Sequence, residues 1–139
     1  MATFATVNAR NRQDAVLQTS IAVPAASASA SATAFKMVGT RKPETMELGV
    51  DVPAMPNNVD SSKSVTITIE HSAALGSGFV ALPGAEVIVV PGVATSGSVA
   101  LQRRIRIPVG ALDFYRVKVD AESGCGSNVA QTITLAALF

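Results

Sequence analysis

The sequence predicts an all-β protein folded as a two-sheet antiparallel sandwich. Three observations predict this class: segments in which apolar and polar residues alternate recur along the 139-residue chain, turns rich in Gly, Pro, Ser and Asn separate them, and no segment has the periodicity of an amphipathic helix. A jelly roll is the expected topology. An immunoglobulin-like sandwich is the alternative, which the lack of Trp and of a cysteine pair disfavours.

The length is that of one domain, and we expect an extended N-terminal arm at residues 1–14 followed by a single β-sandwich domain at residues 15–139. The formal net charge of +1 excludes attraction of nucleic acid or of an acidic partner by bulk charge. With a charged fraction of 15% and a mean hydropathy of +0.37, the surface has few charged side chains to keep the apolar patches of different molecules apart. This composition favours a surface that another protein covers.

The arm is polar, and its larger side chains, Phe4, Val7, Arg10 and Arg12, are spaced irregularly. Phe4 has no evident core to join. The segment is expected to be loose alone and ordered against a neighbour, and a frayed terminus with no role is the alternative.

The first strand is expected at residues 17–23, and Pro24 ends it because proline lacks the N–H group that a ladder needs. Residues 25–34 alternate Ala and Ser, and a loop or an extended edge is favoured there over a helix, since Ser lowers helix propensity. Residues 35–38 predict a short strand.

Residues 46–52 predict a strand with one solvent-facing side, since apolar residues at even positions alternate with Glu47, Gly49 and Asp51. After a proline-bounded loop, residues 64–71 (SVTITIEH) give the clearest strand pattern in the chain.

Short strands are expected at residues 79–82 and 86–90, and the unbroken apolar run EVIVV at 86–90 is typical of a strand covered on both faces. Residues 101–120 predict two adjacent strands joined by a short connection, with apolar side chains on one face and cations on the other. Residues 131–139 predict a final strand with Ile133 and Leu135 inward.

No pattern of reactive side chains indicates catalysis, so we expect a protein that is not an enzyme and needs no cofactor. His71 is the single histidine, and a partly buried, hydrogen-bonded structural role is favoured, because one histidine without clustered acids or thiols cannot complete a zinc site. Cys125, the single cysteine, lies between two glycines and is expected to be an incidental thiol in a turn. The ten carboxylates are scattered and are expected to be solvated.

The one concentration of charge lies at Arg103, Arg104 and Arg106, with Phe114, Arg116 and Lys118 on the expected neighbouring strand. Three interpretations remain open: a solvated sheet face, a protein-contacting face anchored by Arg and an aromatic side chain, and a nucleic-acid-binding face. An aromatic content of 4% is low for a platform that stacks on bases.

The order of three segments, SVTITIEHSAALGSGFVALPG, RRIRIPVGALDFYRVKVDAESG and TITLAALF, resembles the jelly-roll cement, or decoration, proteins of short-tailed bacteriophages, including that of a Bordetella phage. The shared features are a strand ending in a polar bend, an Ile-Pro step before an aromatic-Arg-Val strand, and a Gly-rich loop before the last strand. The likeness spans about the last two thirds of the chain.

The resemblance implies a structural virion protein, made in the host cytoplasm, that binds the outside of an icosahedral shell. Its implied partners are the major capsid protein, whose neighbouring subunits it would bridge, and a second copy of itself in a homodimer, with no nucleic acid and no membrane. The candidate capsid or dimer contacts are Phe4, Val7, Arg10, Arg12, Arg103, Arg104, Arg106, Phe114 and Arg116.

The alternative function is a receptor- or carbohydrate-binding β-sandwich module of a virion or cell surface. Such a module is expected to present aromatic or acidic side chains at its loop tips. The loops PNNVDSS, PGVATSGS and ESGCGSN contain no aromatic residue.

Overall fold

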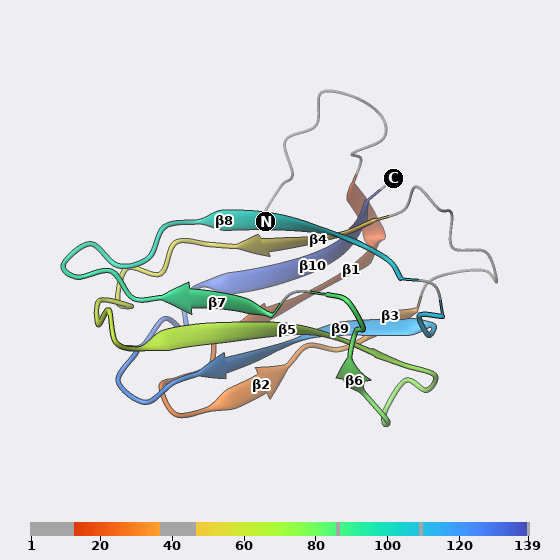
Figure 1. The fold of residues 1–139 in the computed structure, drawn as a ribbon, viewed down its shortest axis with the longest axis horizontal. Helices are drawn as coiled ribbons and strands as arrows, with labels where there is room; N and C mark the ends of the chain where they lie inside the picture. Colours follow the sequence, from red (N-terminus) through yellow and green to blue (C-terminus); the bar gives the residue numbers. More distant parts are fainter. Residues whose placement is uncertain (1–12, 37–46, 86, 109, 139) are drawn as a thin grey trace.

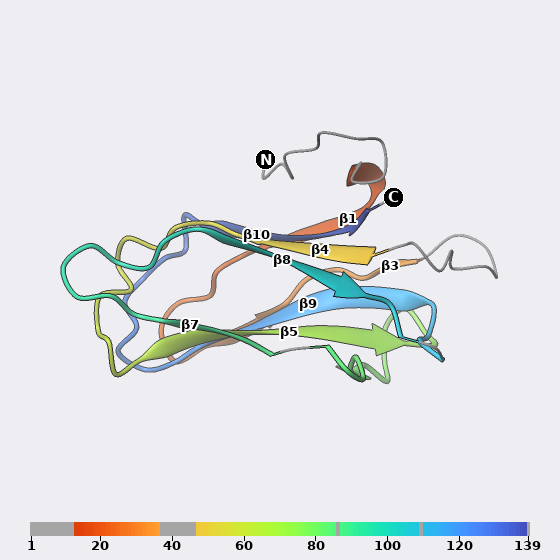
Figure 2. The ribbon, with the colours of Figure 1, turned by 45° about the horizontal axis from the view of Figure 1, so that its top comes forward.

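The computed structural model describes residues 13–36, 47–85, 87–108 and 110–138, and these residues form two antiparallel β-sheets that pack face to face (Figures 1 and 2). The described part of the chain contains no helix, and therefore none that is long and apolar enough to cross a membrane. The predicted all-β sandwich is confirmed.

Ten strands are present in the described residues, and several are only two or three residues long. Their bounds are β1 Gln13–Ala22, β2 Ser29–Ser31, β3 Phe35–Lys36, β4 Glu47–Val52, β5 Ser64–Ser72, β6 Val80–Ala81, β7 Ile88–Pro91, β8 Leu101–Arg106, β9 Phe114–Ala121 and β10 Thr132–Leu138. β1 begins two residues before the expected start of the sandwich domain.

The strand order is that of a jelly roll. One sheet has the order β1-β10-β4-β8, and the other has the order β2-β9-β5-β6, with β3 also paired to β9 and β7 also paired to β5. When β2 with β3 and β6 with β7 are each counted as one interrupted strand, the first strand pairs with the last, the second with the next to last, and so on inward. This nested pairing is the double Greek key of a jelly roll, and it rejects the immunoglobulin-like alternative.

The core lies between the sheets and follows the period-two pattern of the sequence. In β5 the buried residues Val65, Ile67 and Ile69 alternate with half-buried Thr66 and Thr68. The facing sheet contributes fully buried side chains from β4 and β10, among them Leu48, Val50, Ile133 and Leu135. Burying each such side chain stabilises the fold by roughly 1.5–3 kcal/mol, so alternation alone selects the inward face.

The expected hairpin at residues 101–120 is not formed, which corrects one sequence prediction. β8 is an edge strand of the four-stranded sheet and pairs with β4, whereas β9 lies inside the other sheet between β5 and β2. The connection between Arg106 and Phe114 therefore crosses from one sheet to the other. Alternation shows which face of a strand is buried, but it does not show which strand is its neighbour.

The prediction that residues 86–90 form a strand covered on both faces is also wrong. β7 pairs only with β5, at the edge of its sheet. Ile88 and Val90 point into the core, whereas Val87 and Val89 are 52% and 56% exposed. The Ala/Ser segment, expected as a loop or an edge, contains the edge strand β2.

Three loops interlock at the end of the sandwich drawn at the left in Figure 1. The β4–β5 loop contacts the β7–β8 loop through paired bonds between Met55 and Ser98 (2.9 and 3.1 Å), and it contacts the β9–β10 loop through the bond from Asn57 N to Asn128 Oδ1 (3.1 Å). Three glycines, Gly92, Gly97 and Gly126, abut the β4–β5 backbone so closely that a Cβ would fall 2.1–2.4 Å from a carbonyl oxygen. The loop end is thus held together by contacts that only glycine permits.

Candidate functional site

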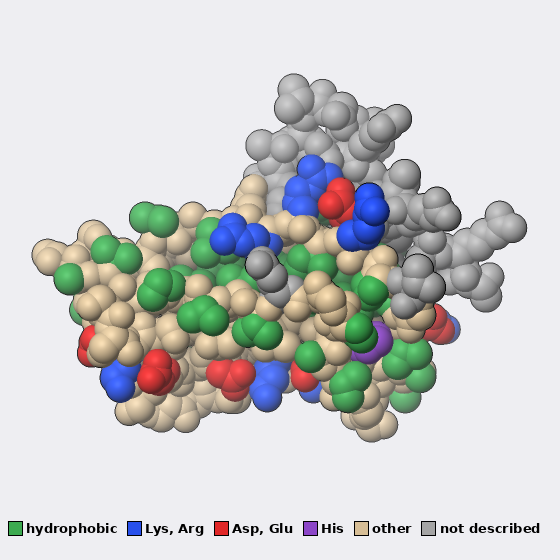
Figure 3. Space-filling model, in the orientation of Figure 1, with side chains coloured by type: hydrophobic (Ala, Val, Ile, Leu, Met, Phe, Trp, Pro, Cys, Tyr) green, Lys and Arg blue, Asp and Glu red, His purple; other side chains and the backbone are tan. Residues whose placement is uncertain are grey.

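The three arginines of β8 are exposed on the edge of the four-stranded sheet. Arg104 Nη2 lies 2.8 Å from Glu47 Oε1 on β4. Figure 3 shows basic and acidic side chains side by side along this edge. Charged side chains on an edge strand oppose unwanted pairing with other chains, so these arginines protect the sheet edge whatever else they bind.

Phe114 and Arg116 lie on the outer face of the other sheet and are half-buried. Arg116 Nε is 2.8 Å from Glu70 Oε1 on β5, and its guanidinium stacks 4.0 Å from the centre of the Phe79 ring. Lys36 Nζ lies 5.7 Å from the centre of the Phe114 ring. The charge of Arg116 is therefore already matched within the fold.

The structure does not form the single basic face expected from Arg103, Arg104, Arg106, Phe114 and Arg116. The physical reason is topological, since β8 and β9 belong to different sheets and turn their outer faces away from each other. The arm residues expected to contact a partner, Phe4, Val7, Arg10 and Arg12, lie outside the described residues.

His71 is buried and hydrogen-bonded, as predicted. The side chain is 5% exposed, and its Nδ1 accepts a hydrogen bond from the backbone N–H of Leu112 at 3.1 Å. Cys125 lies buried in the β9–β10 loop, and burial raises the pKa of its thiol. In the part of the chain that the structure describes, no three His, Cys, Asp or Glu side chains are grouped to hold a metal ion.

Two carboxylates expected to be solvated, Glu70 and Asp51, are buried instead. Glu70 is paired with Arg116, as described above. Asp51 is 7% exposed although it points away from the core, on the outer face of the four-stranded sheet. Burial raises the pKa of Asp51, and a hydrogen bond with the Gln102 side chain partly opposes that rise.

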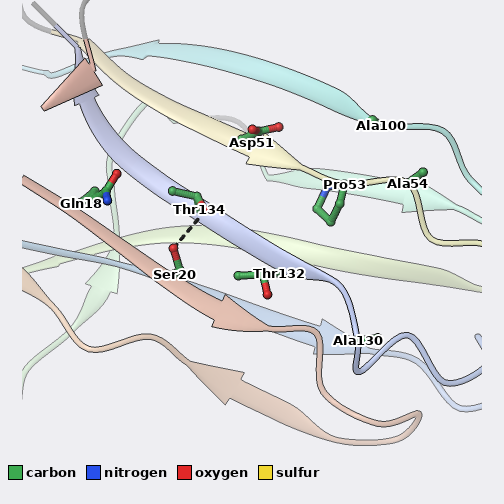
Figure 4. A pocket seen from close by; sticks show the side chains of 9 residues that line it. All are labelled: Gln18, Ser20, Asp51, Pro53, Ala54, Ala100, Ala130, Thr132 and Thr134. Carbon is green, nitrogen blue, oxygen red and sulfur yellow. Dashed lines mark hydrogen bonds between the residues drawn. The ribbon is translucent and has the colours of Figure 1, made fainter. Parts of the chain in front are cut away.

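Asp51 lies at a hollow of about 600 Å³ on this outer face, shown in Figure 4. The lining comes from β1, β4 and β10, from the residues that follow β4, and from those that precede β8 and β10. Its residues are Gln18, Ser20, Asp51, Pro53, Ala54, Ala100, Ala130, Thr132 and Thr134. We call this feature the Asp51 hollow.

A row of polar side chains crosses the four strands at the Asp51 hollow. Ser20 of β1 is the partner of Thr134 of β10, Thr134 is the partner of Asp51 of β4, and Asp51 is the partner of Gln102 of β8. The hydroxyl oxygens of Ser20 and Thr134 are 3.0 Å apart and share a hydrogen bond. Four residues from distant parts of the sequence thus present hydroxyl, carboxylate and amide groups in one line.

Several residues around this row are small. Gly49 and Ala136 are register partners on the central strands β4 and β10, next to the polar row, and alanines line the hollow at three further positions. Small residues in strands mark places where another molecule can approach a sheet closely. Sequence reasoning missed the site, because its residues come from strands that are distant along the chain.

Exposed apolar side chains form a second feature of the surface. Val59, Val93, Val99 and Val129 lie on the three interlocked loops, and Val99 is 75% exposed. We call these four residues the valine tip. Figure 3 shows apolar side chains at this end of the molecule and along the β7 edge.

Comparison with known proteins assigns no family to the chain. No protein-family model matches it, and no curated protein matches it. Among solved structures, the crystal structure of PirA is similar over 94% of this chain and 99% of the PirA chain, with a TM-score of 0.47 and 11% sequence identity. A likeness at this level carries no argument about function.

Proposed function

We propose that the protein is a structural virion protein that binds the outside of an icosahedral phage shell and bridges neighbouring major capsid protein subunits. In this role it acts as a cement, or decoration, protein and associates with a second copy of itself. The resemblance in the sequence first suggested this function, and the jelly-roll topology is the fold that the resemblance implied.

The valine tip is the observation that carries the proposal. Four valines from three loops are exposed at the one end of the sandwich where backbone contacts at Gly92, Gly97 and Gly126 hold the loops in place. Apolar side chains on a preorganised surface bind a protein partner at little entropic cost, because the loops are already ordered. The segment between β7 and β8 that carries Val93 and Val99, residues 92–100, contains no charged residue.

A modest contact suffices for a protein of this kind. Each bound copy stabilises the assembled shell by the free energy of its own binding. Many copies, each touching more than one subunit, sum to a large effect through multivalent attachment. The exposed β8 arginines and the arm residues remain candidates for additional contacts with the shell or with the second copy.

Binding to shells assembled from the major capsid protein of the same virus tests the proposal. The full chain should cosediment with the shells and appear as density on their outer surface. Val99→Ser combined with Val129→Ser should weaken binding by about tenfold or more. Leu75→Ser is the matched control, because Leu75 is 59% exposed in the β5–β6 loop, outside the interlocked loops. Absence of shell binding, or equal losses in both variants, would overturn the proposal.

A further inference from the structure

We propose that the Asp51 hollow is a binding site for a neutral saccharide. This site is separate from the valine tip, and the inference goes beyond attachment to a shell. It rests on the size of the hollow, the chemistry of its lining and the position of a buried carboxylate on an outward face.

The polar groups of the hollow match a ligand that carries several hydroxyl groups. The Asp51 carboxylate accepts hydrogen bonds only, and its two oxygens together provide about four acceptor positions. The Gln102 side chain uses part of that capacity, which leaves positions for two neighbouring hydroxyls of a sugar ring. Ser20, Thr132 and Thr134 supply hydroxyls that donate and accept, so one ligand can meet both kinds of group.

The remaining lining suits the C–H faces of a sugar. Pro53 and the alanines at positions 54, 100 and 130 are apolar and short, which lets a ring lie close to the sheet. A volume of about 600 Å³ lies within the usual range of roughly 300–1,000 Å³ for ligand sites. Figure 4 shows the hydroxyl-bearing and apolar side chains on opposite sides of the same space.

The lining disfavours other classes of small ligand. None of the described lining residues is Lys, Arg or His, so an anion would meet the Asp51 carboxylate with no cationic side chain among them. None of them is a large apolar residue, so a lipid chain would find little surface to cover it. A neutral, hydroxyl-rich molecule is the class that remains.

The position of Asp51 is the strongest single argument for a ligand. Its carboxylate lies on an outward face, where it adds nothing to the core, and it borders the hollow together with the hydroxyl groups of Ser20 and Thr134. A half-enclosed acceptor beside a hollow is the arrangement of a preorganised binding group.

No aromatic side chain is present among the described lining residues, so stacking on a sugar ring does not contribute. We therefore expect weak binding at one site, with a dissociation constant on the order of 1 mM. Copies arrayed on a shell would raise the apparent affinity for a glycan-coated surface through multivalency.

Saturation-transfer NMR with the full chain and neutral mono- and disaccharides, including glucose, galactose, N-acetylglucosamine and maltose, tests the inference. At least one sugar should bind, and backbone amides around Asp51 and Thr134 should shift on titration. Asp51→Asn, which keeps the shape, and Ala100→Leu, which fills the hollow, should each weaken binding at least tenfold. Ala73→Leu, an exposed alanine in the β5–β6 loop, should have no effect.

Absence of binding by every neutral sugar at concentrations up to about 50 mM, which is well above the expected dissociation constant, would overturn the inference. So would binding that survives Ala100→Leu in a variant whose amide spectrum shows a folded chain, or binding of inorganic phosphate or of phospholipid vesicles in place of sugars. Ala100→Leu should still cosediment with shells, so failure of this inference and failure of the proposed function are separate results.

Discussion

Gly126 lies against the backbone of Asn57 with no room between them for a side chain. A Cβ on Gly126 would stand 2.1 Å from the carbonyl oxygen of Asn57, and its φ of +80° is one that other residues rarely adopt. We expect Gly126→Ala to lower the free energy of unfolding by about 2–4 kcal/mol, because overpacking and backbone strain act together. Urea denaturation measures this change.

Gly76 provides the matched control for this substitution. Apart from Gly76 and its two chain neighbours, no residue has an atom within 4 Å of the Cβ position of Gly76. We expect Gly76→Ala to change stability by no more than about 1 kcal/mol, since the main effect is on the unfolded chain. Equal denaturation midpoints for the two variants would show that the loops do not interlock as described.

Tyr115 is fully buried, and its hydroxyl has no hydrogen-bond partner among the described residues. Tyr115→Phe should therefore leave stability unchanged or raise it by about 1 kcal/mol, because a desolvated hydroxyl without a partner is lost. The ring would still pack against Phe35, whose centre is 6.1 Å away. Tyr115→Ala should destabilise by more than about 3 kcal/mol. A large loss in the Phe variant would reveal a partner for the hydroxyl.

The ionisation of Tyr115 gives a second test, because it is the only tyrosine in the chain. Burial, with a smaller effect from Asp113, raises its pKa to about 12 from the ordinary value of 10.0. Absorbance at 295 nm should show little phenolate at pH 10–11 while the protein is folded. Because the pKa of Tyr115 is higher in the folded protein than in the unfolded chain, the free energy of unfolding should fall as pH rises above 10.0. Phenolate should therefore appear together with unfolding. Titration near pH 10 in a folded sample would contradict the burial.

The ion pair of Glu70 and Arg116 should contribute more to stability than that of Glu47 and Arg104. Both pairs have an N–O distance of 2.8 Å, but the first has side chains 12% and 26% exposed and the second 31% and 43%. A double-mutant cycle with alanine should give a coupling energy of about 1–2 kcal/mol for the first pair and below about 0.5 kcal/mol for the second. Equal coupling energies would mean that burial and the Phe79 contact do not strengthen the pair of Glu70 and Arg116.

Asp51 and Asp60 should affect the pH dependence of stability in opposite directions. Burial raises the pKa of Asp51 above 3.8, so its ionised form is disfavoured in the fold. Asp51→Asn should therefore stabilise the protein at neutral pH, and the gain should vanish as pH falls toward 3.8. Hydrogen bonds from the side chain and backbone of Ser62 lower the pKa of Asp60. Asp60→Asn should destabilise the protein at neutral pH, and that loss should shrink as pH falls below 3.8 through the lowered pKa of Asp60. Urea denaturation from pH 3 to 8 measures both.

Cys125 should report the opening of the loop end. The thiol is 1% exposed, and burial followed by the influence of Glu122 raises its pKa. Its reaction with a chromogenic disulfide at pH 8 should be at least about 100-fold slower in the folded protein than in urea, since both access and thiolate are suppressed. Gly126→Ala should accelerate the reaction. Rapid modification of the unmutated protein would mean that the loops open freely.

The sequence was sufficient to predict most of the strands and, for β5, the face that the strand buries. The pattern of residues 64–71 placed Val65, Ile67 and Ile69 inward, and the structure agrees. The pattern of residues 101–120 was equally clear, but the partners inferred from it were wrong. Side-chain alternation is fixed by local geometry, whereas pairing depends on connections that cross between sheets. Adjacent strands in sequence are neighbours often enough to mislead at such a crossing.

The Asp51 hollow could not be predicted for the same reason. Ser20, Thr134, Asp51 and Gln102 become neighbours only when β1, β10, β4 and β8 are placed in that order. In the sequence, Asp51 is one of ten scattered carboxylates with nothing to distinguish it. The valine tip was likewise hidden, because the contacts at Gly92, Gly97 and Gly126 join loops that are remote along the chain.

The position of β10 between β1 and β4 has a consequence for biosynthesis. Until residues 132–138 emerge from the ribosome, β1 has no neighbour in its sheet and the β4–β8 pair has no partner on its other side. The four-stranded sheet can therefore be completed only after β10 has been translated. The nascent chain would expose apolar surface during that interval, and slower translation would not let this sheet form earlier.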